Sequence, residues 1–183
     1  MTDQSKLYPE LFEYYPSTGI IEIYNCVKRT NSDFDSLLQI CKFLAMKGKH
    51  CIILPKSLHF KSQEYHDVFG KLFGSKYEGK CPDLLIDGEF YEHEGFTSKN
   101  NRKAFRNMVN RGLRQSSKII IEDCNLTDSY MLRAILKKQR IGIEIEEVRI
   151  INQKELRLLY KAEKQRLYAA PVFNESVESL AQK

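Results

Sequence analysis

Two acidic residues and one Asp-Gly dipeptide mark the segment of this 183-residue chain that is best suited to chemistry. Asp-Gly between two short apolar runs is the strongest short-range signal for a two-residue β-hairpin loop. With Asp87 and Gly88 in that loop, Asp83 lies opposite Glu92. Directly opposed residues have Cβ atoms about 4.5–5.5 Å apart, and like charges there are destabilising. The sequence therefore predicts a carboxylate pair that needs compensation.

Strand alternation extends this pair to a cluster, because Glu94 shares the face of Asp83 and Glu92. His93 falls on the other face, together with Tyr91. A divalent cation, a Lys or Arg from elsewhere, or a raised pKa that makes one carboxyl a proton donor could each compensate the cluster. The fourth alternative is that these carboxylates are exposed to solvent at a strand end and have no catalytic role.

A basic helix follows the hairpin. Between positions 99 and 118 the chain has several Lys and Arg and no Asp or Glu. The helical period predicts an amphipathic helix over 99–114, with Phe105 and Met108 on its apolar side. The adjoining arc is cationic and contains Lys99, Arg102, Lys103, Arg106 and Arg114. Such a stripe suits phosphate contacts. The alternatives are a solvated face, or an ion pair of Arg102 or Arg106 with Glu92 and Glu94.

The remaining pattern predicts an α+β fold with a mostly antiparallel sheet, a central hairpin and flanking helices. Helices are expected over 33–47, 62–73, 99–114 and 127–138. Strands are expected over 19–24, 50–54, 84–86, 90–91, 118–123, 144–151 and 156–160. The expected organisation is a strand-rich N-terminal extension over 1–32, an α+β domain over 33–161, and a flexible C-terminal tail over 162–183.

Composition narrows the class of protein. Apolar residues make up 42% of the chain and the net charge is +5, which fits a folded domain with a mildly basic surface. No apolar run approaches the roughly 20 residues that span a bilayer, and the first residues lack a secretory signal. The five cysteines include no Cys-x-x-Cys, so structural zinc is not indicated. We expect a cytoplasmic protein without a membrane partner.

Several short motifs together resemble a known family, the RNase toxin domain at the C-terminus of contact-dependent growth inhibition toxins. That domain has the barnase–EndoU–colicin–RelE-like fold and also resembles short proteins of bacterial mobile elements. The similarity runs over 33–161 and rests on the order of elements and on five segments: Cys51-Ile-Ile-Leu-Pro55, Cys81-Pro-Asp-Leu-Leu-Ile-Asp-Gly88, Glu89-Phe-Tyr-Glu-His-Glu94, Asn100-Asn-Arg102 and Arg114-Gln-Ser-Ser-Lys-Ile-Ile-Ile-Glu122.

The resemblance implies a metal-independent endoribonuclease that acts on RNA, with tRNA as the suggested substrate and no cofactor. Carried over position by position, the resemblance implies that Asp83, Glu92, Arg102 and Gln115 lie in the site. With the neighbouring residues of the hairpin, the candidate catalytic residues are Asp83, Glu92, His93, Glu94 and Arg102. With the basic arc of the helix, the candidate nucleic-acid contacts are Lys99, Lys103, Arg106, Arg114 and Gln115. A homodimer formed through a sheet edge is an open alternative for the assembly.

The sequence departs from the family at Glu94, where the family carries a lysine. The same hairpin also resembles a Pro-Asp…(Asp/Glu)-x-Lys DNase core, in which Asp83 and Glu92 would hold Mg²⁺. That core has its lysine at the position of Glu94 too. The function therefore has three readings: an RNase, an Mg²⁺-dependent DNase that lacks this lysine, and a catalytically inactive module that binds nucleic acid or protein.

Overall fold

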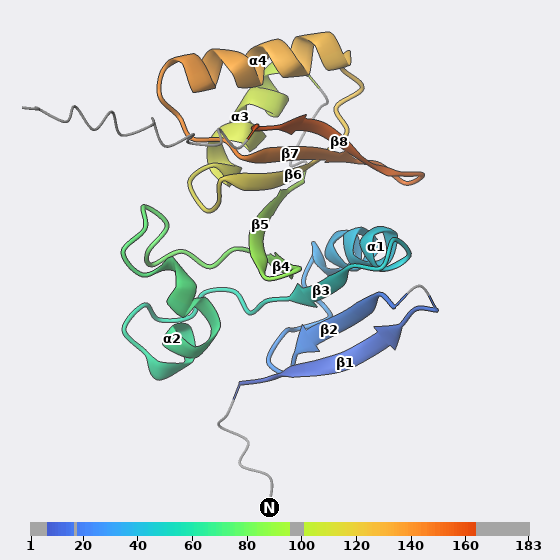
Figure 1. The fold of residues 1–183 in the computed structure, drawn as a ribbon, viewed down its shortest axis with the longest axis vertical. Helices are drawn as coiled ribbons and strands as arrows, with labels where there is room; N and C mark the ends of the chain where they lie inside the picture. Colours follow the sequence, from blue (N-terminus) through green and yellow to red (C-terminus); the bar gives the residue numbers. More distant parts are fainter. Residues whose placement is uncertain (1–6, 17, 96–100, 164–183) are drawn as a thin grey trace, which may run out of the picture.

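The structure is a computed structural model that describes residues 7–16, 18–95 and 101–163 (Figure 1). Lys99 and the predicted tail beyond residue 163 lie outside these residues. The elements follow in the order β1 (Pro9–Tyr14), β2 (Ile20–Tyr24), α1 (Phe34–Ala45), β3 (His50–Ile53), α2 (Gln63–Phe69), a 3₁₀ turn (Gly70–Leu72), β4 (Leu84–Ile86), β5 (Glu89–Glu94), α3 (Arg102–Gly112), β6 (Lys118–Glu122), α4 (Asp128–Arg140), β7 (Glu147–Ile151) and β8 (Leu156–Lys161).

One eight-stranded sheet contains all of these strands in sequence order. The pairs β1–β2, β3–β4, β4–β5 and β7–β8 are antiparallel. The pairs β2–β3, β5–β6 and β6–β7 are parallel, and helices connect the two strands of each of these pairs. The predicted α+β class with a central hairpin is therefore confirmed.

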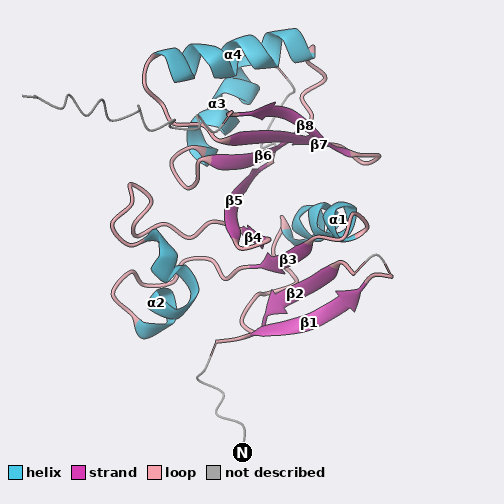
Figure 2. Cartoon of the chain, viewed as in Figure 1, coloured by secondary structure: helices cyan, strands magenta, loops and turns pink. Residues whose placement is uncertain are grey.

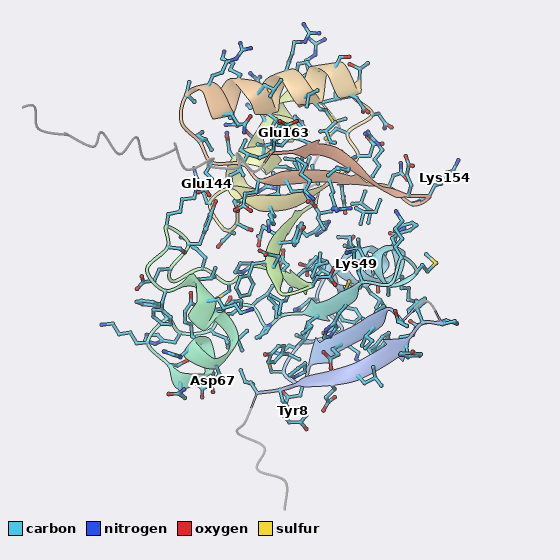
Figure 3. All side chains as sticks on the ribbon, in the orientation of Figure 1. Tyr8, Lys49, Asp67, Glu144, Lys154 and Glu163 are labelled. Atoms are coloured by element: carbon cyan, nitrogen blue, oxygen red, sulfur yellow. The ribbon has the colours of Figure 1, made fainter. Side chains whose placement is uncertain are left out.

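The central hairpin has the predicted register. Leu84 pairs with Tyr91, and Ile86 pairs with Glu89. Asp87 and Gly88 form the loop with φ values of 48° and 81°, the two positive angles that a type I′ turn requires. Lys49, labelled in Figure 3, donates a hydrogen bond to the Asp87 carboxylate over 2.7 Å and holds the turn against β3.

Helices cover both faces of the sheet (Figure 2). Ile120 of β6 packs in the core beneath α1, whereas its neighbours Ile119 and Ile121 pack with α3 and α4. Successive strand residues point to opposite faces, so α1 lies on one face and the α3–α4 pair on the other. A third core, around Tyr65 and Phe69 of α2, also receives Leu85 and Phe90 of the hairpin. The hairpin thus lies between α1, which packs on one of its faces, and α2, which packs on the other.

The N-terminal strands continue the same sheet. Ile21 and Ile23 of β2 are buried in the core beneath α1. Gly19 lies so close to the C-terminus of α1 that an added Cβ would be 1.9 Å from the carbonyl oxygen of Ala45, which no side chain could tolerate. Strand β1 was not predicted as a separate strand, although the extension was expected to be strand-rich. The boundaries at residues 32 and 161 stay predictions.

No helix in the described ranges is long and apolar enough to cross a membrane.

Candidate functional site

The acidic residues of the hairpin meet where β5 ends. Strands β5 and β6 are parallel, so Glu94 and Glu122 lie at the same edge of the sheet. Asp83 directly precedes β4, and its carbonyl accepts a hydrogen bond from the Leu54 amide at the end of β3. Residues from β3, β4, β5 and β6 therefore converge at this edge, which is called the carboxylate edge below.

Asp83 is almost completely buried, with 4% of its surface exposed. Its Oδ2 accepts a hydrogen bond from the backbone amide of His93 over 3.0 Å. Its Oδ1 lies 3.0 Å from the ammonium of Lys56. Both carboxylate oxygens are thus fixed, one by the hairpin backbone and one by a cation from the segment after β3.

Glu92 is the least compensated member of the cluster. Its Oε2 is buried and has no hydrogen-bond partner among the described residues. Burial, reinforced by the neighbouring carboxylates of Asp83 and Glu94, raises the pKa of Glu92 to about 9. The side chain is consequently protonated at neutral pH unless a cation replaces the proton.

Glu94 is neutralised by Arg111 of α3. The guanidinium Nη2 and Nε lie 2.6 Å and 2.8 Å from Oε2 of Glu94. Burial raises the pKa of Glu94, and Arg111 opposes that rise. One alternative left open by the sequence was an ion pair of Arg102 or Arg106 with Glu94. The structure has Arg111 in this role instead, because the last turn of α3 packs on β5 while its first turn faces α4. Arg102 instead lies 4.9 Å from the ring centroid of Tyr130.

Lys56 was not identified from the sequence. Its ammonium pairs with both Asp83 and Asp33, the residue that precedes α1. Burial lowers the pKa of Lys56, but the Asp83 and Asp33 carboxylates raise it above the ordinary lysine value. A cavity of about 200 Å³ that Asp33 and Lys56 help to line lies beside the pair. A cation therefore does stand beside Asp83, although it does not come from position 94.

The imidazole of His93 lies on the other face, as the alternation predicted. Its Nε2 is buried, has no hydrogen-bond partner within the part of the chain that the structure describes, and lies 3.8 Å from Oε1 of Glu122. That oxygen accepts a hydrogen bond from Ser36 of α1. Burial lowers the pKa of His93, with Asp83, Glu122 and Asp33 opposing the change. His93 is thus an enclosed imidazole, and only its backbone joins the carboxylate side of the strand.

The other expected site residues are dispersed. Gln115 precedes the amino end of β6, opposite the end that carries Glu122, and its buried Oε1 has no hydrogen-bond partner among the described residues. Lys103 and Arg114 are exposed at the two ends of α3. The structure therefore gathers Asp83, Glu92 and Glu94 around Lys56 and leaves Gln115 in different surroundings.

The donor set decides which cation could bind. The described residues contain no group of three or more His, Cys, Asp or Glu side chains arranged to hold a metal ion. Mg²⁺ does not need such a group, since it is usually held by one or two carboxylates, water and substrate phosphate. Asp83 and the unpartnered Oε2 of Glu92 supply two hard oxygen donors. The residues present therefore fit Mg²⁺ and do not fit a zinc site.

The buried carboxyl of Glu92 gives a testable pH dependence. Its pKa in the folded protein is raised to about 9 from 4.5, so the stability that the neutral form provides is complete below pH 4.5 and is lost as the pH rises toward 9. We expect Glu92→Gln to unfold at higher urea concentration than wild type at pH 8.5, with a much smaller difference at pH 4.5. Urea unfolding at the two pH values measures this, and a difference that does not grow with pH would contradict it.

Similarity to a known family lies in the same part of the chain. Residues 80–156 match the family model described as the contact-dependent growth inhibition CdiA C-terminal domain. The match begins just before Asp83 and extends from β4 to the first residue of β8. This segment is therefore similar to that toxin domain, over less than half of the chain. No curated protein and no solved structure matches the chain.

Proposed function

We propose that this protein is a nuclease toxin domain that hydrolyses phosphodiester bonds with Mg²⁺ at the carboxylate edge. The supporting observation is the buried, unpartnered Oε2 of Glu92 beside the Asp83 carboxylate, with the Lys56 ammonium 3.0 Å from Asp83. Two carboxylates and one lysine are the functional groups of the Pro-Asp…(Asp/Glu)-x-Lys pattern. Here the lysine comes from the segment after β3.

When bound, Mg²⁺ supplies charge stabilisation to the phosphate and lowers the pKa of a water molecule. Asp83 pairs with Lys56 and is fixed by the His93 amide, so it offers a rigid oxygen donor. Glu92, whose pKa is raised by burial, would hold the cation through Oε2 and would have to lose its proton to do so. Lys56 is partly exposed and places a positive charge beside the two carboxylates, where it stabilises negative charge on a phosphate.

A metal-independent RNase is the second candidate. It is favoured by the His93 imidazole, whose Nε2 lies 3.8 Å from a Glu122 carboxylate oxygen, a pairing that suits proton transfer. The burial of this imidazole on the face opposite the carboxylates makes it the weaker candidate, since a proton-transfer group must reach the substrate.

The chemical ends of the products distinguish the two candidates. Attack by water is expected to leave linear phosphate ends, on RNA or DNA alike, whereas attack by the ribose 2′-hydroxyl leaves a 2′,3′-cyclic phosphate on RNA only. Mass spectrometry of digests of a labelled oligoribonucleotide and of the matching oligodeoxyribonucleotide reads these ends directly. Cyclic phosphates that form equally well in EDTA would replace the metal-dependent proposal with the RNase.

A further inference from the structure

A cationic groove lies between α3 and α4, and neither the family match nor the carboxylate edge explains it. It has a volume of about 590 Å³ and is called the α3–α4 groove below. Of the described residues that line it, none is Asp or Glu. Its charged side chains are Arg102, Arg106, Arg133, Lys137 and Lys138.

The two helices contribute to this groove because they run side by side in the same direction. Arg102 at the start of α3 lies over Tyr130 at the start of α4. Lys138 near the end of α4 donates a hydrogen bond to Asn110 near the end of α3. Both contacts join residues 28 positions apart, so each turn of one helix faces the matching turn of the other. The basic arc that was predicted on α3 thus forms one side of the groove, and α4 forms the other side.

The other residues that line the groove are apolar or aromatic. They are Tyr130, Ala134 and Ile141, and Ile141 is 70% exposed. The guanidinium of Arg102 stands 4.9 Å from the Tyr130 ring centroid. Cationic side chains beside an aromatic ring match a single strand of nucleic acid, because its phosphates bind cations and its unpaired bases stack on aromatic rings. A closed duplex presents phosphates but no free base faces.

The dimensions agree with this occupant. The groove follows α4 from Tyr130 to Ile141, which at 1.5 Å per residue is about 16 Å. The axial rise of one stacked strand is about 3.4 Å per nucleotide, so this length spans roughly five nucleotides. Burial lowers the pKa of Lys138, and a bound phosphate would offset that cost. The groove also shares α3 with Arg111, the residue that neutralises Glu94 at the carboxylate edge.

We propose that the α3–α4 groove binds a single strand of nucleic acid, with phosphates on Arg102, Arg106, Arg133, Lys137 and Lys138 and an unpaired base against Tyr130. The site takes the phosphate backbone of RNA or of DNA. This inference specifies a single-stranded substrate for the proposed nuclease. Binding in the groove is independent of the proposed function, and only the cleavage that follows binding rests on it.

Binding is tested by fluorescence anisotropy in EDTA, with labelled oligonucleotides of about 12 nucleotides. The probes are single-stranded RNA, single-stranded DNA of the same sequence, and the DNA duplex. The test variant is Arg133→Ala with Lys137→Ala, and the control is Lys47→Ala with Lys71→Ala, two exposed lysines that do not line the groove. We expect the test variant to bind single strands about tenfold more weakly than wild type, and the control to bind as wild type does.

The salt dependence gives a second readout of the same contacts. The slope of log affinity against log salt should become shallower by about 0.7 for each lost phosphate contact, or roughly 1.4 for the test variant. Tyr130→Leu should weaken single-strand binding without changing the slope. Preference for RNA or for DNA identifies which strand the groove takes. Unchanged affinity and slope in the test variant would overturn the groove as a nucleic-acid site, and duplex binding as tight as single-strand binding would overturn the single-stranded form.

A small substrate separates failure of the groove from failure of the nuclease. Bis(4-nitrophenyl) phosphate is too short to occupy the groove, so the test variant should hydrolyse it with Mg²⁺ as fast as wild type. Oligonucleotide binding that depends on the groove, in a protein that hydrolyses no phosphodiester, would overturn the proposed function and leave the groove standing. If the test variant binds and cleaves oligonucleotides as wild type does, the groove is overturned as a binding site and the proposed function stands.

Discussion

Asp83→Asn is expected to reduce Mg²⁺-dependent cleavage of oligonucleotides by about a thousandfold. The substitution keeps the size of the side chain and removes the charge that pairs with Lys56 and that would bind the proposed cation. Losses on the order of 10²–10³ are typical when one group that stabilises transition-state charge is removed. Initial rates at saturating Mg²⁺ measure the effect.

The matched control for this substitution is Asp67→Asn on α2 (Figure 3), which makes the same chemical change on an exposed residue far along the chain from the carboxylate edge. It should cleave as wild type does. Wild-type rates in a folded Asp83→Asn protein would show that Asp83 has no part in the reaction.

Lys56→Met is expected to reduce turnover by about a hundredfold, whereas Lys56→Arg should retain most of it. The methionine side chain fills similar space without the ammonium that stands 3.0 Å from Asp83. Removing this partner should also lower the free energy of unfolding by about 1–2 kcal/mol, a modest cost because Lys56 is 40% exposed and its ion pairs are partly screened. Turnover is measured below the unfolding transition of each variant, and stability by urea unfolding.

Lys49→Met provides the control for the loss of stability alone. Lys49 is 47% exposed and pairs with Asp87 at the opposite end of the hairpin, so its loss removes a similar ion pair away from the carboxylate edge. It should lower stability to a similar degree and leave turnover unchanged. If Lys49→Met and Lys56→Met lose turnover equally, the role of Lys56 is structural.

Local sequence signals were sufficient to predict the hairpin that carries Asp83, Glu92 and Glu94. The Asp-Gly loop fixed the register, and strand alternation then placed Asp83, Glu92 and Glu94 together with the His93 side chain on the other face. The positions of α1, α3 and α4 likewise followed from their apolar periodicity, to within a few residues at their ends.

The counter-charges could not be predicted, because they depend on contacts between segments distant in sequence. Lys56 reaches Asp83 only because β3 pairs with β4, where Ile53 lies opposite Leu84. Arg111 reaches Glu94 only because the last turn of α3 packs on β5, so the helix periodicity alone could not distinguish it from Arg102. The second wall of the α3–α4 groove was missed for the same reason, since nothing local in 127–138 indicates that this helix lies beside α3.

The metal dependence of cleavage tests the central claim most directly. Purified wild-type protein is incubated with single-stranded RNA and DNA in Mg²⁺ or in EDTA, with Asp83→Asn in parallel. We expect wild type to cleave in Mg²⁺ only, with cleavage restored when Mg²⁺ is added back after chelation, and Asp83→Asn to cleave about a thousandfold more slowly in Mg²⁺. Equal cleavage in EDTA, or no cleavage of any strand by folded wild-type protein in Mg²⁺, would contradict a metal-dependent nuclease at the carboxylate edge.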